Sequence, residues 1–387
     1  MKKRVCSLLL ALALPLSGCQ AMLEREVSSV QPHTQSFTAR EDPSALEAEN
    51  YQELVSAVLY LVTQHTESGI VRLYNYTGDV ENDLTAACLE VVQKDPLGAF
   101  AVDYIKHEVT RIVSYYEASV FITYRRTAEE MGQVVSVTGS SAIKSELRNA
   151  LSDFDPTSTL RVSYFAEDDE YLRSLIRQAY YDTPLAAFGM PQIELALYPD
   201  SGIRRIVEIG LTYPGEVEDL ASRRDELAAA VGPLLAQVEN PDVEDLYYLL
   251  LDHVDYDPDP ALNTAYDALT GGAANGEGLA LAYKLLCDSA GLTCTVVQGQ
   301  DETGPRYWNI VTTASGSRHV DAAAGLYGLT DVQLMDAGSY QWDSSYPICR
   351  DGSELTRLPG TPDGDPGPKA AAAETEEDFW AEPKNNA

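Results

Sequence analysis

Apolar side chains along the chain recur first at helical spacing and then in strand-like runs, which predicts alternating helices and strands. The first helix starts near residue 51, where four apolar residues recur at helical spacing: Leu54, Val58, Leu61 and Val62. A second helix is expected over 84–91 and ends at Asp95-Pro96. β-Branched and aromatic residues over 112–115 and 118–124 predict two strands after it.

The middle of the chain continues this alternation. The pattern predicts a helix over 141–151, a strand over 160–165 and a helix over 170–181. Strands over 193–198 and 203–213 flank Pro199-Asp200-Ser201-Gly202, whose residues suit a reverse turn, and a long helix is expected over 216–238. These elements predict an α+β fold built from layers of helices and strands.

The first residues indicate export and anchoring. Lys2, Lys3 and Arg4 precede an apolar run over 5–16, which is typical of a signal peptide and too short to span a bilayer. The sequence Leu16-Ser17-Gly18-Cys19 that follows resembles the lipobox of bacterial lipoproteins. This resemblance implies lipidation of Cys19 and attachment to the outer face of the cell membrane. The alternative is an ordinary secretory signal, with Cys19 as a free structural thiol.

Changes in composition divide the chain into five segments. Residues 1–18 are the expected signal peptide, and the polar segment 19–46 is expected to be a flexible tether. The helices and strands predicted above form an N-terminal α+β domain over 47–239, because Asn240-Pro241-Asp242 restarts the chain. A second domain is expected over 240–358, followed by an acidic disordered tail over 359–387.

Charge and cysteine usage narrow the classes of function. A formal net charge of -33 would repel a phosphate backbone, so we expect no nucleic-acid partner. The sequence has no C-x-x-C pair and only five histidines, so we expect no zinc site, and no cofactor is implied. Cys287 and Cys294 are close enough in sequence to close a disulfide loop, although spacing alone does not fix the pairing among these two, Cys88 and Cys349.

From Asp242 to Cys349 the sequence resembles the transglutaminase-like domain of the papain-like cysteine protease superfamily. The similarity is carried by short segments in the order of that family: Tyr256-Asp257, the run 264–269, Gly271-Gly272, a helix over 277–290, and strands over 294–297, 307–311 and 319–321. The resemblance implies an α+β domain after the mixed N-terminal region. It also implies a site formed by a cysteine at the start of a helix, a histidine on the neighbouring strand and an aspartate on the next.

Two of these three catalytic positions differ from the family. Gly276 stands at the cysteine position and Arg306 at the histidine position, whereas Asp321 matches. Glycine has no side chain to attack a substrate, and arginine cannot accept a proton at any ordinary pH. We therefore expect a degenerate site in which Arg306 and Asp321 form an ion pair across adjacent strands; the alternative is that Arg306 points to solvent near the mouth of the cleft.

Other residues offer weaker chemistry. His319 lies two residues before Asp321, but without a nucleophile it has nothing to activate, so it is expected to be a partly buried strand residue. Glu277 and Asp321 would suit glycoside hydrolysis only at a separation of about 5 to 9.5 Å.

These observations favour a lipid-anchored surface protein whose degenerate transglutaminase-like domain acts in binding or scaffolding. Its expected partners are the membrane, through the lipid, and a cell-wall, peptide or surface-protein ligand. The second hypothesis is an active enzyme, either an unconventional hydrolase or a cysteine hydrolase in which Cys287 or Cys294 is the nucleophile. The third is a structural protein in which the N-terminal region makes the contacts. Fold resemblance alone does not decide among them.

Overall fold

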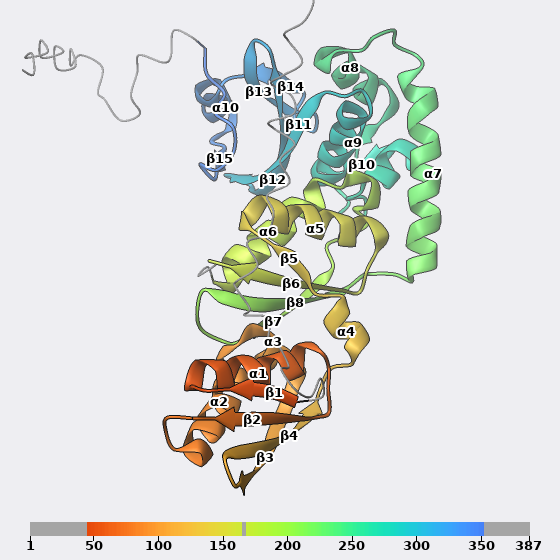
Figure 1. Ribbon diagram of the computed structural model, residues 1–387. Helices are drawn as coiled ribbons and strands as arrows, with labels where there is room; N and C mark the ends of the chain where they lie inside the picture. Colours follow the sequence, from red (N-terminus) through yellow and green to blue (C-terminus); the bar gives the residue numbers. More distant parts are fainter. Residues whose placement is uncertain (1–44, 165–167, 352–387) are drawn as a thin grey trace, which may run out of the picture. The chain divides into compact units, whose positions relative to one another are not determined.

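The computed structural model describes residues 45–164 and 168–351 (Figure 1). Helices and mixed sheets alternate throughout, so the predicted α+β class is confirmed. The expected signal peptide, Cys19 and the acidic tail lie outside the described residues. The predicted tether lies outside them as well, apart from its last two residues, which open strand β1 (Ala45–Ala48).

The described residues form two compact units. The first contains residues up to 134 together with 197–206, and the second contains 135–196 together with 207–351. The expected boundary at residue 240 falls inside the second unit, between α7 (Val217–Leu235) and α8 (Val243–His253). Within the described residues, no helix is both long and apolar enough to cross a membrane.

The first unit is a four-stranded sheet with two helices packed on one face. Its elements are β1, α1 (Tyr51–Thr63), β2 (Ser68–Tyr74), α2 (Val80–Lys94), α3 (Pro96–Ala101), β3 (Val102–Ile112) and β4 (Tyr115–Tyr124), in the sheet order β1-β2-β4-β3. Asn50 and Asp79 cap the two long helices, and Leu54, Val58 and Val71 belong to the core between helices and sheet. The short helix α4 (Ala128–Gly132) follows β4.

The strand predicted over 112–115 is wrong in its bounds. Residues 113 and 114 form the turn between β3 and β4, and β3 itself occupies 102–112. Its residues alternate between half-buried positions, such as Ile105 and Val109, and exposed polar ones. Because only one face of this edge strand is buried, apolar residues are sparser along it than along β4.

The second unit begins with the same arrangement of elements. These are β5 (Val135–Val137), α5 (Gly139–Asp153), β6 (Thr157–Ser163), α6 (Asp169–Tyr181), the 3-10 turn η2 (Pro184–Ala186), β7 (Gln192–Tyr198) and β8 (Arg204–Thr212). The sheet order β5-β6-β8-β7 reproduces β1-β2-β4-β3, and the first two strands are parallel in both sheets. The predicted helices and the hairpin around Pro199 correspond to α5, α6, β7 and β8.

In each copy, a tyrosine at the end of the last strand makes equivalent hydrogen bonds. The Tyr124 hydroxyl donates to the carbonyl oxygens of Leu61 at 3.2 Å and Thr66 at 3.1 Å. The Tyr213 hydroxyl donates to Ala150 at 3.4 Å and Asp155 at 3.1 Å. Each of these three residues has its counterpart at the same interval in the sequence, and the order of helices and strands is also the same, so the two sheets are copies of one β-α-β-α-β-β unit.

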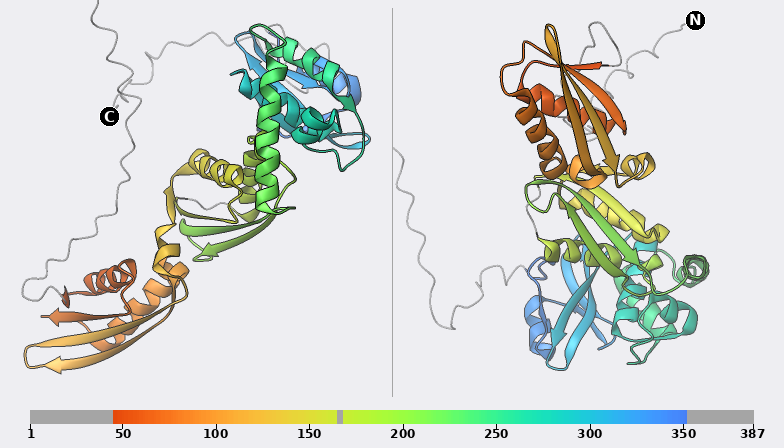
Figure 2. Two further views of the ribbon diagram at one scale, coloured as in Figure 1. Left: turned by 90° about the vertical axis from the view of Figure 1, so that its right-hand side faces the viewer. Right: turned by 90° about the horizontal axis from the view of Figure 1, so that it is seen from below.

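The rest of the second unit is a helical layer packed against a five-stranded sheet. Helix α7 packs against η2 and the π-helical turn η3 (Asp267–Gly271). The elements that follow α7 in the sequence include α8, β9 (Asp255–Tyr256), β10 (Ala273–Ala274) and α9 (Gly276–Ser289) (Figure 2). The sheet has the order β14-β13-β12-β11-β15. Its strands are β11 (Thr293–Asp301), β12 (Gly304–Thr313), β13 (Gly316–Asp321), β14 (Leu326–Leu329) and β15 (Gln341–Trp342).

Helix α9 is buried from Gly278 to Cys287, because it packs against β11, β12 and α8. Helix α10 (Asp331–Gly338) lies beyond β14. Trp308 of β12, fully buried, is at the centre of the core on this side of the sheet, with Val297, Leu334 and Tyr340. The start of α9 and the neighbouring ends of β12 and β13 are thereby held in fixed positions.

Candidate functional site

A cleft of about 210 Å³ opens at the start of α9. Its walls come from the segment after β9, the first turn of α9, the start of β12 and the segment after β13. The lining residues are Tyr256, Pro258, Pro260, Asn275, Gly276, Glu277, Pro305, Arg306, Tyr307 and Ala323. Two of the three expected catalytic positions, Gly276 and Arg306, therefore line one cleft.

Gly276 is the first residue of α9, directly after the capping residue Asn275. The Asn275 side-chain oxygen accepts hydrogen bonds from the backbone N–H groups of Glu277 at 3.0 Å and Gly278 at 3.1 Å. A Cβ at Gly276 would meet only ordinary contacts, 3.7 Å from Ala323 Cβ and 3.8 Å from Tyr307 O. A side chain therefore fits at this position, whereas a Cβ at Gly278 would come within 2.9 Å of Leu262 O.

Arg306 and Asp321 form the ion pair that the sequence predicted. Arg306 Nη2 lies 3.0 Å from Asp321 Oδ2 and donates to the Tyr340 hydroxyl oxygen at 2.9 Å. The Tyr340 hydroxyl in turn donates to Asp321 Oδ2 at 2.7 Å, and Arg306 Nε lies 3.2 Å from Asp301 Oδ2. Arg306 thus faces two carboxylates.

This network fixes the charge of its members. Burial disfavours the cation of Arg306, but the hydrogen bond to Tyr340 and the charges of Asp321 and Asp301 outweigh it and raise the pKa of the guanidinium. Burial and the neighbouring Asp321 raise the pKa of Tyr340 to about 12. Arg306 is therefore a permanent cation and Tyr340 a neutral donor, and neither is a general base near neutral pH.

Glu277 is the carboxylate that lines this cleft. Its Oε1 accepts a 2.6 Å hydrogen bond from the hydroxyl of Tyr181 on α6, and its Oε2 accepts a 3.4 Å contact from Asn263 Nδ2. Burial raises the pKa of Glu277, and the two hydrogen bonds oppose that shift only in part. The ring of Tyr181 lies 5.9 Å from that of Tyr307, so the second repeat supplies part of the wall behind the acid.

The cysteines lie away from this cleft. Cys88, Cys287, Cys294 and Cys349 are all buried, and none of them is among the lining residues. Burial raises the pKa of Cys88 and of Cys349 to about 12, and it also raises the pKa of Cys294. A thiol held in its protonated form is a poor nucleophile.

The disulfide that the sequence spacing allows between Cys287 and Cys294 is not formed: both residues are free thiols. The two side chains interact as neighbours, and Cys294 Sγ also accepts a 3.4 Å hydrogen bond from Asn309 Nδ2. These sulfurs are packed in the core between α9 and the sheet as apolar groups.

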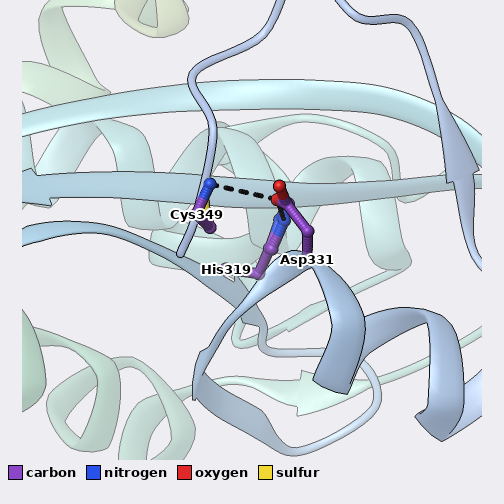
Figure 3. Close-up of side chains that lie close together, drawn as sticks. All are labelled: His319, Asp331 and Cys349. Carbon is purple, nitrogen blue, oxygen red and sulfur yellow. Dashed lines mark hydrogen bonds and ion pairs between the residues drawn. The ribbon is translucent and has the colours of Figure 1, made fainter. Parts of the chain in front are cut away.

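A second cluster, formed by His319, Asp331 and Cys349, lies on the side of the sheet near α10 (Figure 3). Its His, carboxylate and Cys ligand atoms all lie within 4.8 Å of one another. His319 Nδ1 is 3.0 Å from Trp308 Nε1, and Nε2 is 3.0 Å from Asp331 Oδ1. Because an indole N–H can only donate, Nδ1 must be the acceptor, and the proton of the neutral ring must reside on Nε2.

This tautomer does not suit a metal site. A neutral imidazole that binds a metal through Nε2 carries its proton on Nδ1. In His319 that proton would point at the Trp308 N–H, so two donors would face each other without an acceptor. The protonated Nε2 instead donates to Asp331, whose Oδ1 also accepts the backbone N–H of Cys349 at 3.1 Å. Burial lowers the pKa of His319. The cluster therefore acts as a structural clasp between β13, the start of α10 and residue 349. His319 is a strand residue as expected, but it is fully buried rather than partly buried.

Sequence reasoning did not identify Tyr181 or Tyr340 as parts of the site. Tyr181 precedes Glu277 by 96 positions, and no local pattern links the two residues. The raised pKa of Glu277 also depends on its burial, which a sequence does not report.

Comparisons with known proteins give no family assignment. No family model matches the chain, and no curated protein matches it. A solved structure described as a TGase is 14% identical over 59% of this chain and 68% of its own, with a TM-score of 0.25. A candidate protease from Parabacteroides distasonis is 9% identical over 65% of this chain, with a TM-score of 0.21, and the match spans 39% of that protein. Neither similarity assigns an activity.

Proposed function

We propose that residues 240–351 form a non-catalytic binding module whose ligand enters the cleft at the start of α9. The observation that carries this proposal is Gly276: the position nearest the helix N-terminus, where an attacking group would be placed, has no side chain. The described cysteines are buried elsewhere, and Arg306 is neutralised by its own carboxylates.

The proposal includes attachment to the outer face of the cell membrane through a lipid on Cys19. It is supported by the basic residues, apolar run and lipobox-like sequence at the N-terminus. Replacement of Cys19 by Ser should move the protein from the membrane fraction to the soluble fraction. Membrane association unchanged in this variant would contradict the anchor while leaving the binding module intact.

An acid-catalysed hydrolase is the second candidate, because a half-buried carboxyl with a raised pKa can act as a general acid. Glycoside hydrolysis also needs a second carboxylate facing the substrate. Among the described residues, Glu277 is the one acid that lines the cleft, and Asp321 is held by Arg306 and Tyr340. The geometry therefore favours binding over hydrolysis.

Thiol labelling of the full chain tests the binding proposal against the cysteine-enzyme hypothesis. The native protein is treated with a thiol-reactive peptide electrophile and mapped peptide by peptide. We expect Cys88, Cys287, Cys294 and Cys349 to remain unlabelled in the folded protein, and no ammonia to be released from glutamine peptides. Selective labelling of one of these thiols together with ammonia release would overturn the proposal.

Gly276→Cys provides the matched control. The space around Gly276 accepts a side chain, so this variant should fold normally and label at residue 276. The double variant Gly276→Cys with Arg306→His asks whether these positions are those of a catalytic pair. If they are, its thiol should react faster than that of Gly276→Cys alone.

A further inference from the structure

Glu277 is a half-buried anion with neutral partners. The hydrogen bonds from Tyr181 and Asn263 supply no positive charge, and no ion pair involves Glu277 within the part of the chain that the structure describes. A carboxylate that is removed from water without a counter-charge costs free energy. A ligand that brings a cation would recover that cost.

The arginine in the same cleft does not serve this purpose. Arg306 is paired with Asp321 at 3.0 Å and with Asp301 at 3.2 Å, so these three groups together carry one net negative charge. Glu277 adds a second. The charged groups at the cleft therefore leave an excess of negative charge in spite of the guanidinium.

The sequence around the cleft adds further negative charge. Residues 225–283 contain 12 Asp and Glu and neither Lys nor Arg. Three of these acids, Asp255, Asp257 and Asp259, are exposed on the segment that lines the mouth of the cleft through Tyr256, Pro258 and Pro260. Asn275 Nδ2 holds this segment against the helix start through a 3.1 Å bond to Asp259 O. Such a surface attracts cations to the cleft and repels anions.

An anion has no counterpart site at the helix start. The backbone amides of Glu277 and Gly278, which would bind an anionic group at a helix N-terminus, already donate to Asn275 Oδ1. The cleft therefore differs from an anion-binding helix terminus.

The walls and size of the cleft suit a long side chain. Tyr256 and Tyr307 present aromatic rings, and three prolines add apolar surface. An aliphatic stem can pack against such walls while a cationic head contacts a ring face or the carboxylate. The volume of about 210 Å³ lies below the range of about 300 to 1,000 Å³ that is typical of small-molecule pockets. It fits one side chain of a larger ligand.

We propose that this cleft recognises the basic side chain of a peptide ligand, an ammonium or guanidinium group for which Glu277 is the counter-ion. The inference rests on the proposed binding function and specifies its ligand class. Tyr181 is a positioning residue in this site, since its hydroxyl orients Glu277 from behind and leaves Oε2 with only a long contact to Asn263.

The test uses four capped tripeptides that differ in their central residue: Lys, Arg, citrulline and Glu. Each is titrated into the full chain at low ionic strength, and binding is followed by the amide NMR signals of residues 276 and 277. We expect the Lys and Arg peptides to bind at least tenfold more tightly than the citrulline peptide, which matches arginine in shape but carries no charge.

Two variants assign the effect to Glu277. Glu277→Gln keeps the acceptor for Tyr181 and removes the charge, so it should weaken binding of the Lys and Arg peptides at least tenfold. Asp252→Asn removes an exposed charge of the same acidic stretch, on α8 and outside the cleft lining, and should change affinity less than twofold. Equal binding by Glu277→Gln, or equal loss in both variants, would overturn the assignment.

The remaining outcomes separate this inference from the proposed function. If the Glu or citrulline peptide perturbs residues 276 and 277 as strongly as the basic peptides, the cleft binds ligands but the cationic class is wrong. If no peptide binds, the inference is wrong. Reactive thiols in the labelling experiment would instead overturn the binding proposal itself.

Discussion

Among single residues, Glu277 carries a charge that its own surroundings oppose. Burial raises its pKa, so the folded protein loses stability as pH rises from below the ordinary carboxyl pKa through the raised value. Glu277→Gln resembles the protonated form and escapes this loss. We expect the variant to be more stable than the wild type at pH 7 and equally stable below about pH 4, where the carboxyl group is protonated in both the folded and the unfolded chain.

Denaturant unfolding of both proteins at the two pH values measures this difference. A wild type that is more stable than Glu277→Gln at pH 7 would show that the carboxylate has a counter-charge in the free protein. That result would also remove the basis for a cationic ligand.

His319 has the opposite dependence on pH. Because burial lowers its pKa, the unfolded chain binds a proton more readily, and the stability that the neutral ring provides is lost as pH falls below about 6.5. His319→Phe leaves Trp308 Nε1 and the Asp331 carboxylate without this partner and should cost about 3 kcal/mol at pH 7.5. The cost should be smaller at pH 5.5. Chemical unfolding at both values measures it, and a cost independent of pH would contradict the lowered pKa of His319.

Between neighbouring elements, Asp321 connects β13 to β12 and to the segment before β15. It is almost fully buried and accepts bonds from Arg306, Tyr340 and the backbone N–H of Ala324. Asp321→Ala should destabilise the protein by about 3 kcal/mol, because Arg306 then keeps only one carboxylate partner, Asp301, beside the Tyr340 hydroxyl. Urea unfolding followed by tryptophan fluorescence gives the value, with Asp301→Ala as the milder control. If Asp321→Ala unfolded at the wild-type urea concentration, the pair would be irrelevant to stability.

Periodic elements were the most predictable part of the fold. The helices expected over 141–151 and 170–181 correspond to α5 (Gly139–Asp153) and α6 (Asp169–Tyr181), because one face of each is apolar. The edge strand β3 was missed, since its exposed face interrupts the apolar pattern. The repeat was also missed: it consists of strand order and of carbonyl bonds to Tyr124 and Tyr213, which side-chain patterns do not encode.

The candidate site was predictable only where chemistry depends on residue type. Gly276 and Arg306 could be aligned from the neighbouring sequence. The missing side chain of Gly276 and the positive charge of Arg306 follow from the residue types themselves. The partner of Glu277 could not be found in this way, because Tyr181 belongs to a different sheet-and-helix layer and meets the acid only after the second unit has folded.

For the whole molecule, the dominant property is its net charge of -33. Self-repulsion of this kind destabilises a compact state, and dissolved salt screens it. An increase of NaCl from 20 to 200 mM should therefore stabilise the protein by about 1 kcal/mol, or about 2 to 4 °C in Tm. Scanning calorimetry measures the shift, with equal osmolality of an uncharged solute as control. A Tm that stays constant or falls with salt would contradict this expectation.

The hydroxyl behind Glu277 has a practical consequence for anyone who trims the protein. A fragment starting at α8 would retain all ten cleft-lining residues and omit Tyr181, which belongs to α6. In this fragment Glu277 would lose the hydrogen bond from Tyr181, and its Oε1 would be open to water. The ligand affinity measured on the fragment would therefore be lower than that of the full chain. Any fragment prepared for a ligand screen should therefore begin before α6.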